Sequence, residues 1–222
     1  MRKCIITTAL AIFLIPAIWA QTDLTQLSLD VQEKYNQNFA AMAQFTWQRN
    51  VQVFMKGDLK ATIVANVSVG SDGKPVSNVV DQTSTTKKKP GIRGAVQSSQ
   101  IDDTKEYVEN ALKLVVEYIF MSKGQMVDLF STKGIVSQLG NNLQVQGSNF
   151  IVQGDNLQYL YNITTLECVS QTVNTVMSGD PVKAVVTYKE VQGVNMVDKI
   201  TLDLPAKGLN AIAVNSQWAK RL

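Results

Sequence analysis

The sequence predicts a protein of the α+β class, in which two main helices cover one face of a long antiparallel sheet. Apolar residues recur at steps of three and four in segments 22–44 and 101–122, which is the spacing of an amphipathic helix. Apolar and polar residues instead alternate through 45–82 and through most of 125–217, with glycine-containing turns between the runs. No internal repeat or linker divides the chain, so we expect a single domain over residues 21–222.

The first twenty residues have the pattern of a secretory signal peptide. A basic start, MRK, precedes an apolar run from Cys4 to Ile18, and Ala20 ends the segment. An uncleaved anchor is the alternative, but the run is short for a membrane span, which needs about 20 apolar residues. We therefore expect removal of residues 1–20 and an exported chain without stable membrane insertion.

The composition of the remaining chain bounds its partners and its compartment. Without the two basic residues of the signal peptide, 19 basic residues face 18 acidic ones, so no general positive charge favours nucleic acid. Cys168 is then the only cysteine, and no disulfide can form within the chain. An exported domain of this size without a disulfide fits a bacterial periplasm, which is the localisation we expect.

The first helix and the first three strands follow from the residue pattern. The helix at 22–44 has one apolar stripe, made of Leu24, Leu27, Val31, Tyr35, Phe39 and Met42. The alternation then predicts strands at 45–56, 59–69 and 76–82. Gly-Asp and Asp-Gly pairs supply the turns between them.

A segment without apolar period separates these strands from the second helix. Residues 83–100, TSTTKKKPGIRGAVQSSQ, are polar and contain proline and glycine, so we predict a mobile loop. The second helix is expected at 101–122, with Ser99 and Asp102 spaced as an N-terminal capping box. Six to eight short strands of an antiparallel meander should follow.

The end of the meander contains a hairpin, with PVKAVVTYKEVQG at 181–193 and VNMVDKITLDLPAKG at 194–208. Its apolar residues alternate onto a single face, which carries Val182, Ala184, Val186, Tyr188, Ile200, Leu202 and Leu204. This face should join one sheet surface beneath the two helices. The residues alone leave open whether that surface is a filled core or a pocket.

No residue pattern points to catalysis. The chain has no histidine, which removes histidine-dependent triads and the commonest metal ligand. It has neither a phosphate-binding P-loop nor a dinucleotide-binding fingerprint. Cys168 alternates in phase with Leu166 and is interpreted as a small buried side chain. We therefore predict a protein that is not an enzyme and has neither a metal nor a cofactor.

One arginine lies where a charge is unfavourable. Arg49 shares a strand face with Trp47, Val51, Val53 and Met55, and an unpaired charge on such a face is costly. Either Arg49 reaches the sheet margin or an acid on the first helix, or it lines a cavity and holds a lid or the polar head of a ligand. In the second case all five residues are candidate cavity-lining residues.

The basic run in the 83–100 segment is the other candidate site. Lys87, Lys88, Lys89 and Arg93 give it a local positive charge. The run is either a solvated connector or a contact for an acidic partner surface or lipid head groups.

The order of the elements resembles the LolA/LolB-like superfamily of periplasmic lipoprotein carriers. The resemblance lies in an export signal, a helix running directly into FTWQRNVQVFMKG, and a meander that ends in YKEVQGVNMVDKITLDLPAKGLNAIAVNSQW. It implies a strongly curved antiparallel sheet, an incomplete β-barrel, with an apolar cavity under the helices that in the carriers holds acyl chains. The carriers' functional arginine and lid-helix prolines match no position here, so no site residue is transferred.

Two functional hypotheses follow. The first is a periplasmic carrier for a lipid-like or acylated ligand, with a lipid or an acylated protein as partner. The alternative is a non-catalytic envelope scaffold that binds a protein partner through a sheet edge or through loop 83–100. An enzyme ranks third. The volume and lining of the concave sheet face distinguish the first two.

Overall fold

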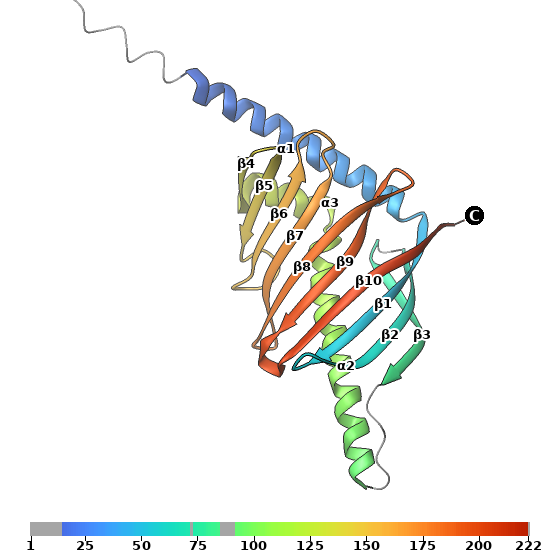
Figure 1. Ribbon diagram of the computed structural model, residues 1–222. Coiled ribbons are helices and arrows are strands. Elements are labelled where there is room, and N and C mark those ends of the chain that lie inside the picture. The colour runs from blue at the N-terminus through green and yellow to red at the C-terminus, as the bar shows by residue number, and fades with distance from the viewer. Residues whose placement is uncertain (1–14, 72, 85–91, 222) are drawn as a thin grey trace, which may run out of the picture.

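The computed structural model describes residues 15–71, 73–84 and 92–221, which form a ten-stranded antiparallel sheet and three α-helices (Figure 1). The helices are α1 (Ile15–Met42), α2 (Ile92–Ile119) and α3 (Lys123–Asp128), which continues into a π-helical turn (Leu129–Lys133). The strands are β1 (Phe45–Met55), β2 (Asp58–Val69), β3 (Pro75–Ser84), β4 (Gly134–Leu139), β5 (Asn142–Ser148), β6 (Asn156–Asn162), β7 (Cys168–Met177), β8 (Asp180–Val191), β9 (Val194–Leu204) and β10 (Leu209–Lys220).

The sheet is open because its two edge strands do not pair with each other. Its order is β3-β2-β1-β10-β9-β8-β7-β6-β5-β4. The last strand returns to the first, with Phe45 opposite Lys220 and Met55 opposite Leu209. The predicted α+β class with an incomplete barrel is therefore confirmed. Figure 1 shows α2 crossing one face of the sheet, while α1 lies along the ends of the strands.

The second helix begins earlier than its residue pattern indicated. It starts at Ile92, so the predicted loop 83–100 was wrong at both ends, since β3 also continues to Ser84. Ser99 and Asp102 lie inside α2 and form no cap at its start. The first turns of α2 extend beyond the sheet (Figure 1). Residues 92–100 have no apolar period, so the residue pattern did not indicate a helix there.

The other helix ends differ by smaller amounts. The first helix begins at Ile15 rather than at residue 22, and α2 ends at Ile119 rather than at residue 122. Ser122 starts α3 instead, because its hydroxyl accepts the Gln125 amide N–H while the Gln125 side chain accepts the Ser122 N–H.

Some of the predictions fall on other parts of the chain. The first 14 residues of the predicted signal peptide and the three lysines Lys87–Lys89 lie outside the described residues. Arg93 lies in the first turn of α2. Within the described residues, no helix is both long enough and apolar enough to cross a membrane.

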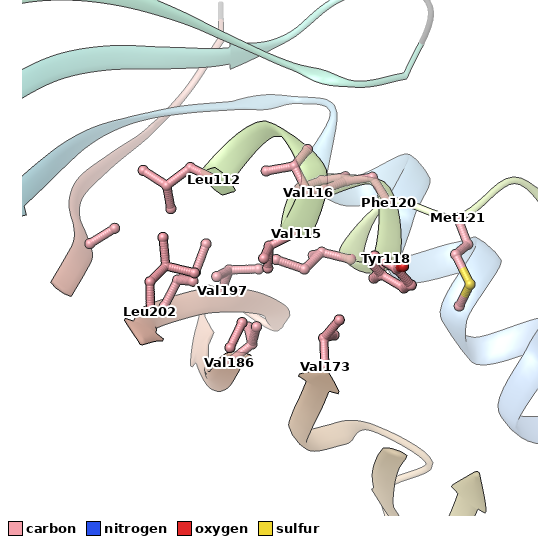
Figure 2. Close-up of a cluster of buried hydrophobic side chains, with 14 of the residues drawn as sticks. Leu112, Val115, Val116, Tyr118, Phe120, Met121, Val173, Val186, Val197 and Leu202 are labelled. Carbon is pink, nitrogen blue, oxygen red and sulfur yellow. The ribbon is translucent and has the colours of Figure 1, made fainter. Parts of the chain in front are cut away.

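The core lies between α2 and the strands at the centre of the sheet. The predicted apolar face of the β8–β9 hairpin is buried there, with Val182, Ala184, Val186, Ile200, Leu202 and Leu204 each at most 1% exposed. Figure 2 shows Leu112 and Val115 of α2 turned toward Leu202 and Val186 of this face. This part of the concave surface is therefore a filled core.

The first helix is attached through amide and hydroxyl groups as well as apolar contacts. Asn38 donates to the carbonyl of Asn195 at 2.8 Å and accepts the Asn195 N–H at 2.7 Å, which fixes α1 to the start of β9. The Tyr35 hydroxyl lies 3.1 Å from the carbonyl oxygens of Ile119 and Met121. The Ile119 carbonyl belongs to the last residue of α2, and the Met121 carbonyl lies just beyond it, where helical partners are missing. The first helix therefore also stabilises the end of α2.

A buried carboxylate connects α2 to the sheet. Asp155, which is 2% exposed, accepts the backbone N–H groups of residues 150, 151 and 152 at 2.7 to 2.9 Å. It also accepts the Tyr118 hydroxyl of α2 at 2.8 Å, and that hydroxyl lies 2.9 Å from Thr175 Oγ1 of β7. A buried charge with this many donors is well compensated.

Replacement of Asp155 should therefore destabilise the whole domain. Asp155→Asn keeps the size but places an amide N–H₂ where N–H donors converge, and we expect a loss on the order of 3 kcal/mol in the free energy of unfolding. Urea denaturation measures it. Asp128→Asn is the control, because Asp128 is exposed. Equal urea midpoints for the two variants would show that the Asp155 network does not hold α2.

Candidate functional site

A cavity of about 500 Å³ lies between α2 and the β1–β3 end of the sheet. Its apolar lining consists of Val51, Ile63, Ala65, Pro75, Val76, Val79, Val108, Leu112 and Val116. Charged side chains join it from both sides: Arg49, Lys74, Glu109, Lys113 and Glu117. The concave surface that is filled over β8 and β9 is thus hollow over β1, β2 and β3.

The cavity lies along the side of α2 that faces β1 and β2. The face of α2 that contains Val115 packs on the core strands (Figure 2), whereas Val108, Leu112 and Val116 border the space beside it. The edge strand β3 contributes Val76 and Val79, which remain 56% and 47% exposed. Every residue of β3 after Pro75 is exposed, so the apolar lining is accessible from the edge of the sheet.

An ion pair joins the two walls of the cavity. Lys74 immediately precedes β3 in the β2–β3 hairpin. Its Nζ lies 2.7 and 2.6 Å from the two carboxylate oxygens of Glu117 in α2. Both side chains are more than one third exposed, so the pair is screened by solvent and contributes little stability. Its position nevertheless links the hairpin to the helix across the cavity.

Arg49 is the one charged residue of the cavity that is almost fully buried, with 6% exposure. It lies on β1 between Ala65 of β2 and Asn215 of β10 in the sheet register. Its Nε donates to Asn215 Oδ1 at 3.0 Å. Asn215 in turn donates to the carbonyl of Val197 at 2.8 Å, which fixes the orientation of its amide.

Arg49 forms no ion pair with another described residue, and Asn215 is its hydrogen-bond partner in that part of the chain. Burial lowers the pKa of Arg49 to about 10. At neutral pH the guanidinium therefore keeps its proton and its positive charge. The expected pairing with an acid on the first helix is absent from the described residues, and the cavity-lining position is observed.

The five residues that sequence reasoning grouped on β1 separate in the structure. Arg49 and Val51 line the cavity. Trp47 and Val53 belong to the buried core, and Met55 is partly buried against it. The Trp47 indole N–H is buried without an acceptor among the described residues. The α2 and β3 lining was missed, because the α2 stripe was interpreted as core and β3 as an ordinary strand.

A second, smaller cavity lies beside Cys168. It has a volume of about 30 Å³. Its lining includes four tyrosines, which are Tyr35 of α1 and Tyr159, Tyr161 and Tyr188 of the sheet. That volume admits about one or two water molecules. Cys168 is half-buried rather than fully buried, and burial of its Sγ raises the pKa of the thiol to about 12. In the described part of the chain, no cluster of acidic or cysteine side chains could hold a metal ion.

Cys168 should therefore react slowly as long as the protein is folded. With a pKa of about 12, roughly one thiol in 10⁴ is ionised at pH 8, and we expect alkylation by iodoacetamide about 10³-fold slower than for a free cysteine. Mass spectrometry of the peptide that contains Cys168 follows the labelling, and 8 M urea serves as the unfolded control. Equal rates in the folded and unfolded chains would contradict this assignment.

Comparison with known proteins identifies structural neighbours. No family model and no curated protein matches the sequence. The structure is similar to a DUF1329 family protein from Desulfovibrio piger, with 10% identity, a TM-score of 0.45, and coverage of 88% of this chain and 92% of that one. It is also similar to a LolA superfamily protein from Nitrosomonas europaea, with 11% identity, a TM-score of 0.39, and coverage of 88% and 94%.

Proposed function

We propose that the protein is an exported, periplasmic carrier that binds a lipid-like or acylated ligand in the cavity between α2 and β1–β3. The observation that supports this most directly is the cavity itself. Its volume of about 500 Å³ lies within the range of about 300–1,000 Å³ that is common for small-molecule sites. Apolar side chains dominate its lining, and a single buried cation adds a specific polar contact.

Export is supported by the sequence rather than by the cavity. The basic start and apolar run of residues 1–20 have the pattern of a signal peptide. A carrier, as opposed to an enzyme, fits a cavity whose titratable lining residues are lysine, arginine and glutamate on its walls, without a histidine in the chain. The basic residues Lys87, Lys88, Lys89 and Arg93 remain candidates for contact with head groups or an acidic partner.

Protein purified from the bacterial periplasm should carry its ligand. Native mass spectrometry is expected to show adducts of lipid mass that organic extraction removes. The extracted protein should then bind a fluorescent fatty-acid probe. An apo mass from the periplasm together with an absence of probe binding would refute the carrier function.

A tryptophan on the edge strand tests whether the ligand occupies this cavity. Val79 lines the cavity and is 47% exposed, so Val79→Trp can fill the space with little overpacking. We expect probe affinity to fall by about tenfold or more, because the indole occupies ligand volume. The control is Val80→Trp, since Val80 is 51% exposed and does not line the cavity. Equal losses in both variants would place the ligand elsewhere.

The scaffold alternative is favoured by a different observation. Strand β3 is exposed at every position after Pro75 and pairs only with β2, so its outer backbone groups can accept an added strand. Crosslinking in cells distinguishes the two functions. A single protein partner attached to β3 supports the scaffold, whereas lipid or several acylated proteins support the carrier.

A further inference from the structure

From the cavity and its buried cation we infer that the carried ligand is a single-chain amphiphile with an anionic head, whose carboxylate or phosphate binds the guanidinium of Arg49. This inference rests on the carrier function proposed above and narrows it to one chemical class. The inference is based on the burial of Arg49, the hydrogen bonds that orient its side chain, and the distribution of charge around the cavity.

The first step is the missing counter-charge. Arg49 is 6% exposed, and its neighbours across the strands are Ala65 and Asn215, neither of which is charged. A buried cation without a compensating anion is unfavourable. The cavity lining contains two glutamates, Glu109 and Glu117, and neither forms an ion pair with Arg49. Glu117 is instead bound to Lys74 through both oxygens.

The second step is orientation. Asn215 accepts from Nε, and its own amide is held by the Val197 carbonyl. This contact uses one edge of the guanidinium and leaves both Nη groups without an acceptor among the described residues. Since Arg49 lines the cavity, an anion inside it can accept hydrogen bonds from these groups. The planar guanidinium suits carboxylate and phosphate oxygens, which it can bind in a bidentate manner.

The third step is the shape of the remaining lining. Val51 follows Arg49 on the same strand face, and Ile63, Leu112 and Val116 surround them from β2 and α2. These side chains provide an apolar wall for a hydrocarbon chain that begins at the bound head. A volume of about 500 Å³ is that of a site for a ligand of drug-like size. It accommodates one chain rather than the several chains of a triacylated lipoprotein anchor.

Twelve-carbon ligands that differ only in the head group test the inference. Dodecanoate, dodecyl phosphate, dodecanol and dodecyltrimethylammonium compete with a fluorescent probe below their micelle concentrations. The extracted wild-type protein should bind the better anion about 10- to 100-fold more tightly than dodecanol, as expected for a hydrogen-bonded charge pair. It should bind the cation most weakly. Comparison of the affinities for dodecanoate and dodecyl phosphate identifies the preferred head group as carboxylate or phosphate.

Substitution of Arg49 is the second part of this test. Arg49→Gln should reduce anion affinity to that of dodecanol and leave dodecanol binding within about twofold, whereas Arg49→Lys should retain part of the preference. Lys199→Gln is the matched control, because it removes one exposed positive charge away from the cavity. Thermal unfolding of each variant confirms that it is folded before binding is compared.

The outcomes separate this inference from the function on which it rests. If wild-type protein binds dodecanol as tightly as both anions, or if Arg49→Gln keeps the anion preference, the inference is wrong while the carrier function stands. If none of the four ligands displaces the probe and the probe itself does not bind, the carrier function fails as well. The wild-type comparison decides the first question even if the Arg49 variants do not fold.

Discussion

Polar contacts along one side of α2 fix the position of this helix on the sheet. The Tyr118 hydroxyl bonds to Asp155 and contacts Thr175 of β7, and the Tyr107 hydroxyl donates to Asp180 at the start of β8 at 2.9 Å. Hydrophobic burial alone has no preferred direction, whereas these bonds require particular partners. They hold one side of the helix against β7 and the start of β8, and the cavity lies on its other side, toward β1–β3.

The β1–β3 end of the sheet, on the cavity side of α2, has the properties that follow from this placement. Strand β3 is exposed along its length, Val76 and Val79 remain open to solvent, and the space beneath α2 is hollow. The first helix does not fill it, because Asn38 and Tyr35 attach α1 to the start of β9 and to the residues that follow α2. The concave surface of the sheet thus has two parts, a filled core on one side of α2 and a cavity on the other.

The sequence predicts the strands well because their faces differ strongly in polarity, and this alternation also placed Arg49 on the inner face of β1. Its partner Asn215 could not be predicted, since the two residues meet only through the register of β1 with β10, 166 positions apart in the chain. The start of α2 was missed because residues 92–100 have no apolar period. The apolar period of α2 predicted an inward face, but periodicity cannot divide inward positions between a core and a cavity.

Arg49 is a charged residue at an inner strand position, where the fold alone would favour an apolar side chain. The other inner positions of β1 from Phe45 to Val53 are apolar and almost fully buried, and an apolar side chain at position 49 would avoid the desolvation of a cation. Asn215 satisfies one edge of the guanidinium but supplies no charge. Local departures of this kind concentrate at functional sites, where the missing stabilisation comes from a bound ligand. We therefore propose that the buried cation on the wall of this apolar cavity lies at the end where ligand charge is recognised.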